Sequence, residues 1–389
     1  MAFLYSSWTK HCPQRPAPEV SESILSDPDA LERADPGSML RATASAGAQV
    51  RIAAEQVGHD ALARVAADGR PRSIVMTGMG GSGISGDVLA AVVGNMCPIQ
   101  ITTVRGYSLP GWVGPLDLVI PVSCSGRTEE TLSVAGQAIR RGARVLGVGA
   151  DGSPLQELVR GARAPFLEVD AAGRMPRASL WTLAIPLLLV ASALELLDLP
   201  PAVLAATADR LDELAAAYGP GVDLGENVAK DLGLDLALSA PLIWGTGEIG
   251  AVAANRLACQ LNENAKQAVT FGSLPEANHN QVVALAGRTG TQSRDLFADP
   301  GSDAEPRLVL LRDVGEPEQV ARRADISREI AENYGIPVTV LHAEGGHPLE
   351  RLASLIAPID FASVYAAFVR GVDPTPIEPI DELKARLAQ

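Results

Sequence analysis

Short apolar runs alternate with amphipathic stretches over much of the chain. Between about residues 70 and 170 the runs have the length of strands, and the stretches between them have helical spacing. The predicted strands are residues 73–77, 99–104, 117–122, 144–148 and 165–169. The predicted helices between them are residues 84–93, 129–141 and 155–160. Continuous apolar strands separated by helices predict a parallel sheet covered on both faces.

The alternation resumes after a long helical region. Residues 171–225 carry apolar positions at helical spacing, and Pro200-Pro201 divides them into helices 177–196 and 203–218. Further strands are predicted at residues 240–244, 267–271, 307–312 and 337–342. Further helices are predicted at residues 249–262, 317–333, 349–369 and 377–387. The pattern therefore predicts two copies of one α/β architecture.

The first part of the chain has a different pattern. Residues 1–69 contain no strand signal, whereas residues 27–29 could begin a short helix and residues 39–67 have helical spacing. A chain of 389 residues is also too long for one ordinary core. We expect an N-terminal helical extension (1–69), a first α/β unit (70–225) and a second one (226–389).

Composition excludes several functional classes. The chain is 47% hydrophobic and 20% charged, and its formal net charge is −14, which argues against nucleic acid or an anionic membrane as the main partner. The first ten residues lack the apolar core of a signal peptide, and residues 180–196 are predicted to be a buried helix rather than a membrane span. The cysteines lie far apart with no CxxC pair and are expected to be reduced; they are Cys12, Cys97, Cys124 and Cys259. We expect a cytoplasmic protein.

Two loops carry the candidate binding chemistry. The glycine loop, GMGGSG (residues 78–83), follows the strand at 73–77, and the hydroxyl loop, SCSGRT (residues 123–128), follows the strand at 117–122. Each lies where a buried strand ends and a helix begins, so backbone N–H groups at the positive end of a helix are available to an anion. In a parallel sheet both loops lie at the carboxyl edge, where ligands bind. The pair predicts a phosphate site.

Two other interpretations of these loops fit part of the pattern. The glycine loop satisfies the G-x-G-x-x-G pattern of dinucleotide sites, but the second strand ends without the acid that grips a ribose. Arg105 there could face a 2′-phosphate, which leaves NADP open. One hydroxyl of the second loop could be a simple helix cap, but Ser123, Ser125 and Thr128 together exceed that need. A phosphomonoester is the ligand favoured, with no cofactor.

GMGGSG followed by SCSGRTEET resembles the sugar isomerase (SIS) domain, which binds phosphosugars. The doubled arrangement over residues 70–389 resembles the bifunctional phosphoglucose/phosphomannose isomerases. The resemblance implies two three-layer αβα SIS subdomains with parallel sheets. Arg127 and Gly106 depart from the Asn and Asp usual there, and they leave the preferred substrate open. The residues that the resemblance assigns to the sugar phosphate are Gly81, Ser82, Ser123, Ser125 and Thr128.

Interconverting an aldose and a ketose phosphate requires ring opening, proton transfer between C1 and C2, and stabilisation of an enediolate. From the pattern alone, Glu263 in an N-E-N segment is either a surface residue or a base held by amides. His279 in an N-H-N segment is either exposed and idle or an acid–base group. From the pattern alone, Arg177 could be a surface cation and Lys384 a solvated residue in the last turn of a helix. The resemblance implies that Glu263 is the base and that Arg177 stabilises the enediolate, and it makes Lys384 a candidate for contact with the sugar. It also implies that His279 enters the neighbouring subunit's site, which makes a homodimer necessary.

The remaining candidate chemistry is a small polar cluster. His342, Glu344 and His347 follow a strand and a glycine-rich loop, and their spacing matches no metal template. We expect a metal-independent aldose–ketose isomerase acting on glucose 6-phosphate, mannose 6-phosphate or both to give fructose 6-phosphate. The alternative is a non-catalytic sugar-phosphate sensor, which would keep both loops but would not need Glu263 and His279 together.

Overall fold

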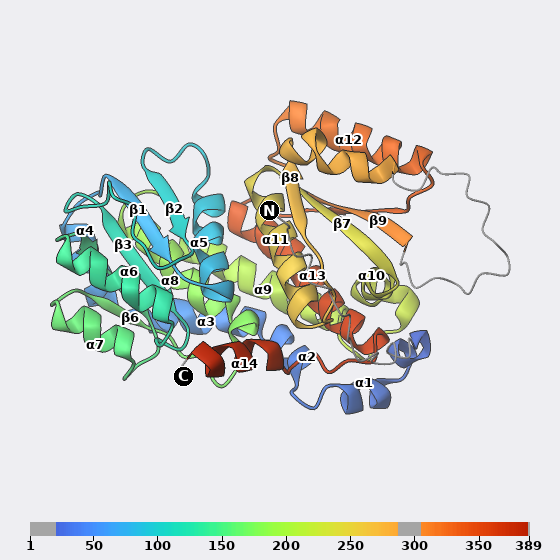
Figure 1. The fold of residues 1–389 in the computed structure, drawn as a ribbon, viewed down its shortest axis with the longest axis horizontal. Coiled ribbons are helices and arrows are strands. Elements are labelled where there is room, and N and C mark those ends of the chain that lie inside the picture. The colour runs from blue at the N-terminus through green and yellow to red at the C-terminus, as the bar shows by residue number, and fades with distance from the viewer. Residues whose placement is uncertain (1–20, 287–304, 388–389) are drawn as a thin grey trace, which may run out of the picture.

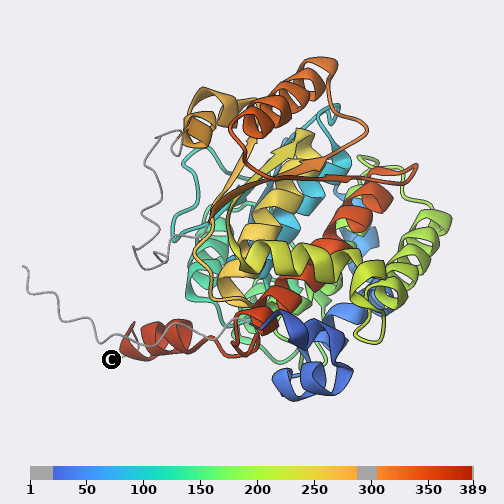
Figure 2. The same ribbon diagram turned by 90° about the vertical axis from the view of Figure 1, so that its right-hand side faces the viewer.

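The structure is a computed structural model that describes residues 21–286 and 305–387. Two parallel sheets lie side by side, each flanked by helices, and a helical N-terminal segment runs beneath both (Figure 1). The turned view shows the second sheet enclosed between helices on its two faces (Figure 2). The predicted α/β class with a helical N-terminal extension is confirmed.

The first sheet contains six parallel strands in the order β2-β1-β3-β5-β6, with β4 beside β3. Alternate residues of β1 face opposite layers, because Ile74 and Met76 pack with α5 and α8 whereas Val75 packs with α6 and α7. The strands are β1 (Ser73–Thr77), β2 (Gln100–Val104), β3 (Leu118–Ser123), β4 (Arg144–Val145), β5 (Gly147–Gly149) and β6 (Phe166–Glu168). The helices are α5 (Gly80–Val93), α6 (Glu129–Arg140), α7 (Pro154–Gly161) and α8 (Leu180–Ala193).

The second sheet has four parallel strands in the order β10-β9-β7-β8. Its central strand β7 pairs with β8 and β9, as β1 pairs with β2 and β3, so the predicted repetition of one plan is confirmed. The strands are β7 (Ser239–Thr246), β8 (Phe271–Leu274), β9 (Glu305–Arg312) and β10 (Val338–His342). The helices around it are α10 (Val228–Ala237), α11 (Gly247–Glu263), α12 (Glu318–Asn333) and α13 (Pro348–Val369).

Four elements differ from the sequence-based predictions. Residues 80–83 form the first turn of α5 rather than a loop before it. The predicted strand at 267–271 is wrong, because the buried side chain of Gln267 donates to the carbonyls of Leu236 and Ser239 and β8 begins only at Phe271. The predicted helix 177–196 is divided into the short 3-10 helix η2 (Pro176–Ala178) and α8, and α10 was not predicted.

Helix α13 is the central element of the core. It is long and apolar enough to cross a membrane, yet its apolar window lies 100% inside the protein. It packs against α10, α11 and α9 (Pro201–Ala217), while α5 of the first half contacts α11 of the second. Apolar side chains from both halves therefore form one continuous core.

The described part of the N-terminal extension is helical, as predicted, and residues 1–20 lie outside the described chain. It comprises η1 (Glu22–Ser26), α1 (Pro28–Ala34), α2 (Met39–Ala44), α3 (Ala46–Gln56) and α4 (His59–Ala67). Lys230 on α10 anchors it, because its Nζ donates to the carbonyl oxygen of Leu25 at 2.7 Å. The same ammonium donates to Pro220 at 2.9 Å and Val222 at 2.7 Å, and Lys230 is 2% exposed.

Replacing Lys230 by Met should destabilise the protein, because three carbonyl oxygens, one in a buried and two in partly buried hydrogen bonds, lose a charged donor. We expect the free energy of unfolding to fall by about 2–4 kcal/mol. The measurement is urea unfolding followed by circular dichroism, with Lys384→Met on the exposed terminal helix α14 (Glu378–Leu387) as the matched control. Equal midpoints for the two variants would show that this anchor contributes nothing to stability.

Candidate active site

The glycine loop brings the start of α5 against the segment that carries Arg177. Gly80 has a φ of +51°, the left-handed region that favours glycine, and it opens the helix after Met79. A Cβ on Gly81 would lie 2.9 Å from the carbonyl oxygen of Pro176 and 3.6 Å from Cα of Arg177. The absence of a side chain therefore permits the first N–H groups of α5 to lie beside Arg177.

The hydroxyl loop meets the glycine loop directly. The backbone N–H of Cys124 donates to Oγ of Ser82 at 3.3 Å, which joins the two loops. The hydroxyls of Ser123 and Thr128 are hydrogen-bonded at 2.9 Å, and the N–H of Arg127 donates to Oγ of Ser125 at 3.3 Å. The predicted phosphate residues of the two loops thus lie at one edge of the sheet, as the pairing of β1 with β3 requires.

Two features of the hydroxyl loop fix its shape and charge. Gly126 has a φ of +63°, and a Cβ there would lie 2.1 Å from Oγ of Ser153. Burial raises the pKa of the Cys124 thiol above its ordinary value, although Arg174 opposes the shift. A neutral thiol rather than a thiolate therefore adjoins the site at neutral pH, which suits an anionic ligand.

Arg177 lies in η2, between the first and second halves. Its guanidinium is 3% exposed and donates through Nε to Oδ1 of Asn264 at 2.7 Å. Nη2 donates to the carbonyl oxygens of Pro374 and Thr375, at 2.7 and 2.8 Å. Nη1 lies 3.5 Å from Oε2 of Glu263. Burial lowers the pKa of Arg177, and Glu263 and Asp373 oppose that shift.

Glu263 is the last residue of α11, and its side chain is 28% exposed. Among the described contacts, neither neighbouring amide bonds its carboxylate. Asn262 instead exchanges hydrogen bonds with the backbone of Val269, at 3.0 and 2.9 Å. Asn264 bonds Arg177 and donates to Oγ of Ser363 at 2.9 Å. The two amides therefore hold the end of α11 and Arg177 in place, and the carboxylate remains accessible beside the guanidinium.

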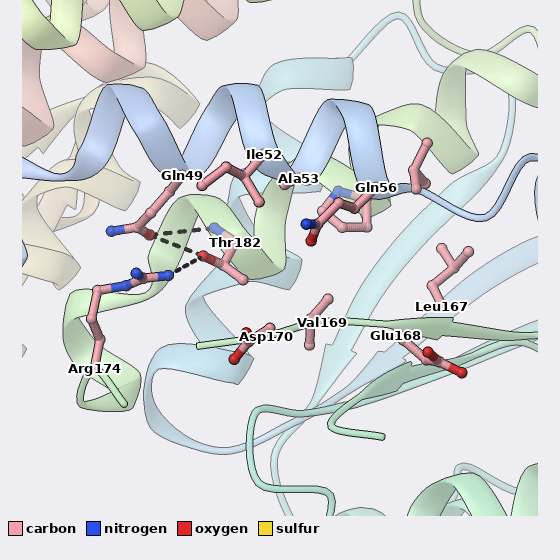
Figure 3. A pocket seen from close by; sticks show the side chains of 12 residues that line it. Gln49, Ile52, Ala53, Gln56, Leu167, Glu168, Val169, Asp170, Arg174 and Thr182 are labelled. Carbon is pink, nitrogen blue, oxygen red and sulfur yellow. Dashed lines mark hydrogen bonds between the residues drawn. The ribbon is translucent and has the colours of Figure 1, made fainter. Parts of the chain in front are cut away.

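The N-terminal extension also contacts the segment that carries Arg177, through Gln49 on α3, which Figure 3 shows beside Thr182 and Arg174. Gln49 on α3, which is nearly fully buried, donates through Nε2 to the carbonyl oxygen of Ala178 at 2.8 Å. Its Oε1 accepts from the hydroxyl of Thr182 on α8 at 3.2 Å, and Arg174 donates to that hydroxyl at 3.2 Å. The residue following Arg177 is thus fixed by a side chain that sequence analysis did not single out.

His279 and Lys384 do not join this group. His279 ends η4 (Glu276–His279), just after β8, whose Leu274 pairs with Thr246 at the start of α11. Glu263 ends the same 17-residue helix, and such a helix is about 25 Å long. Within one chain, His279 and Glu263 therefore lie near opposite ends of α11. Lys384 lies on α14, which projects from the body with no buried residue (Figure 2).

The matching edge of the second sheet has no hydroxyl residue at the positions that correspond to Ser82, Ser123, Ser125 and Thr128. After β7, Gly247 has a φ of +59° and corresponds to Gly80, but Glu248 and Ile249 stand where the first half has Gly81 and Ser82. The loop after β9 reads DVGEP (residues 313–317) where the hydroxyl loop has CSGRT. The glycine skeleton of the turn is retained, but acids and apolar residues replace the groups that would bind a phosphate.

The polar cluster near α13 has structural contacts. Glu344 pairs with Arg210, and His347 caps α13 by accepting from the N–H of Leu349 at 3.1 Å. Within residues 21–286 and 305–387, no group of three or more His, Cys, Asp or Glu side chains has an arrangement that could hold a metal ion.

Replacing Gly81 by Ala tests the contact between the glycine loop and the Arg177 segment. The added Cβ must displace the Pro176 carbonyl, so we expect binding of inorganic phosphate, measured by calorimetry, to weaken by about tenfold. Gly161→Ala at the end of α7, where a Cβ meets nothing within 4 Å, is the control. Equal affinities in both variants would contradict the predicted site.

Comparison with known proteins identifies the family. Residues 225–387 match the family model of the bacterial phospho-glucose isomerase C-terminal SIS domain. The bifunctional phosphoglucose/phosphomannose isomerase of Caldicellulosiruptor bescii is 33% identical over 320 residues, covering 81% of this chain and 89% of that protein. The Aquifex aeolicus protein of the same name is 30% identical over 317 residues, covering 81% and 90%.

A solved structure supports the fold independently. The C-terminal domain of glucosamine-fructose-6-phosphate aminotransferase from Francisella tularensis superposes with a TM-score of 0.63 at 14% identity, covering 86% of this chain and 96% of that one. At that identity the likeness concerns the fold alone, and it agrees with two parallel sheets. Taken with the identity and coverage of its sequence relatives, the chain belongs to the bifunctional phosphoglucose/phosphomannose isomerase family.

Proposed function

We propose that the protein interconverts glucose 6-phosphate, mannose 6-phosphate or both with fructose 6-phosphate through an enediolate. The observation that carries this proposal is the position of Glu263, 3.5 Å from Arg177, whose backbone in turn packs against Gly81 of the glycine loop. A carboxylate and a cation thus lie next to a predicted phosphate site. The names of the C. bescii and A. aeolicus relatives support the same reaction.

The substrate is held by its phosphate. Ser82, Ser123, Ser125 and Thr128 supply hydroxyls, and the first turn of α5 supplies backbone N–H groups that favour an anion. In an open-chain hexose 6-phosphate, the reacting carbons C1 and C2 lie at the end opposite the phosphate. Binding at the two loops therefore directs those carbons away from the sheet, towards Arg177 and Glu263.

Glu263 then transfers the proton. Starting from the aldose, its carboxylate removes the proton from C2, and the electron pair moves through C1 to the carbonyl oxygen, giving the enediolate. The carboxylic acid returns the proton to C1, and the hydroxyl proton moves from the oxygen on C2 to the oxygen on C1, which gives the ketose. The Nη1 group of Arg177 faces Glu263 and stabilises the negative charge that develops on the oxygens. Because a buried guanidinium already supplies this positive charge, the proposed reaction requires no metal.

Ring opening is assigned to His279 of a second copy. Glu263 and His279 lie near opposite ends of the 17-residue helix α11, so one chain does not bring them together. A homodimer in which each exposed His279 enters the other subunit's site resolves this separation. Lys384, on the projecting helix α14, is the further candidate for contact with the sugar.

Each part of the chain has its own role in the proposed reaction. Residues 70–225 form the phosphate-binding unit, residues 226–389 form the unit that supplies Glu263 and His279, and residues 1–69 support the Arg177 segment through Gln49. We assign the enzyme to the cytoplasm because Cys97, Cys124 and Cys259 are free thiols, as is usual for proteins of a reducing compartment.

Replacing Glu263 by Gln removes the proposed base with little change in size. In a coupled assay with both hexose phosphates, kcat should fall by at least about a thousandfold while KM changes by less than about threefold. Glu329→Gln, on the exposed face of α12, is the matched control. The assay contains EDTA, so turnover by the unaltered protein also tests metal independence.

The same assay distinguishes an isomerase from a non-catalytic sugar-phosphate sensor. Binding of hexose phosphate with no exchange of the C2 proton into solvent would favour a non-catalytic sensor. Undiminished turnover in Glu263→Gln would refute Glu263 as the base while leaving the reaction itself intact.

Mixing two inactive variants tests the shared site. Glu263→Gln and His279→Ala proteins should each be inactive, but after subunit exchange a mixed dimer contains one site with both native residues. About half of randomly paired dimers are mixed, so we expect recovery to about a quarter of the wild-type activity. No recovery, despite exchange demonstrated by mass spectrometry, would contradict the sharing of His279.

A further inference from the structure

A buried ion pair lies behind Arg177, and no step of the proposed reaction uses it. Arg256 on α11 donates through Nε and Nη2 to the two carboxylate oxygens of Asp360 on α13, at 2.7 and 2.6 Å. Gln260 donates to the same carboxylate at 3.2 Å. Arg256 is 2% exposed and Asp360 is 7% exposed. A buried pair of this kind often stabilises a fold no more than apolar side chains would, so stability alone does not explain it.

The ion pair reaches the backbone of Arg177. Besides its bonds to Asp360, Nη2 of Arg256 donates to the carbonyl oxygen of Arg177 at 2.9 Å. Asp360 therefore fixes the guanidinium of Arg256, and that guanidinium fixes the peptide from which the Arg177 side chain extends.

A second route from the same turn of α13 reaches the Arg177 side chain. Ser363 donates to the carbonyl oxygen of Asp360 at 2.7 Å, and its Oγ accepts from Nδ2 of Asn264 at 2.9 Å. Oδ1 of Asn264 accepts from Nε of Arg177 at 2.7 Å. Asn264 and Ser363 are both fully buried, so water does not compete for these bonds. One turn of α13 thus holds Arg177 at both its backbone and its side chain.

We propose that Asp360 and Arg256 are positioning residues that set Arg177 for the isomerisation. The proposal rests on the proposed function of Arg177 and Glu263. Arg177 has only Nη1 directed at Glu263, whereas its other nitrogens are bonded to Asn264, Pro374 and Thr375. Because small errors in placing a charged group can cost about a hundredfold in rate, fixing this one nitrogen matters for the reaction.

The test compares two ion pairs that involve helix α13, namely the buried pair of Asp360 with Arg256 and the partly exposed pair of Arg351 with Asp313. Asp360→Asn keeps the size of the side chain but removes one acceptor and the charge that pairs with Arg256. Its kcat should fall by at least about tenfold, with KM within about twofold, because the phosphate loops are not touched. The matched control is Asp313→Asn, which breaks the pair between Asp313 and Arg351 at 2.8 Å near the start of α13. That control should lose stability without losing kcat.

A double-mutant cycle distinguishes positioning from general destabilisation. If Asp360 acts through Arg177, adding Asp360→Asn to Arg177→Ala should change kcat by less than about twofold, because the group being positioned is already absent. Ser363→Ala, a milder change on the second route, should lower kcat several-fold in the native background and should also be silent beside Arg177→Ala.

Three results would overturn the proposal. The first is an unchanged kcat in both Asp360→Asn and Ser363→Ala. The second is a decrease in kcat no larger than that of Asp313→Asn. The third is a decrease in kcat that is just as large when Arg177→Ala is also present. These results differ from a failure of the proposed function, because in that case the unaltered protein would show no isomerase activity in the same assay. If Asp360→Asn does not fold, the Ser363→Ala arm of the cycle decides the question.

Discussion

Arg177 carries a positive charge into the interior, and the surrounding chain stabilises it there. Burial of a guanidinium is costly unless its N–H groups are satisfied. Here Asn264, the carbonyls of Pro374 and Thr375, and the carboxylate of Glu263 surround it. Because these partners come from α11 and from the segment after α13, satisfying one charge fixes the second half of the protein against the first.

The two halves have similar folds but contribute different groups to the proposed site. The first half retains the hydroxyls that follow β1 and β3, whereas the second half has acids and apolar residues at the matching positions after β7 and β9. The second half instead contributes the C-terminal end of α11, where Glu263 lies 3.5 Å from Arg177. In the proposed mechanism, the substrate therefore binds at the edge of the first sheet and reacts at the end of a helix from the second unit.

The sequence predicted the elements that depend on local pattern and missed contacts that depend on packing. The glycine loop and the hydroxyl loop could be predicted because each directly follows an apolar strand, and glycines and small hydroxyl residues at that position are typical of an anion site. The interpretation of the N-E-N segment as amides holding a base differed from the structure, since the partners of Asn264, namely Arg177 and Ser363, lie about a hundred residues away in the chain. No sequence motif indicated Gln49, Arg256 or Asp360, because the role of a buried polar side chain can be recognised only when its hydrogen-bond partner is known.

In the proposed active site, the phosphate loops and Arg177 of the first half lie next to Glu263 of the second half. A crystal structure with fructose 6-phosphate bound tests this arrangement most directly. We expect the phosphate among Ser82, Ser123, Ser125 and Thr128, C1 and C2 within about 3.5 Å of the Glu263 carboxylate, and His279 of a second copy near the ring oxygen. A phosphate bound at the edge of the second sheet, or reacting carbons directed away from Glu263, would contradict it.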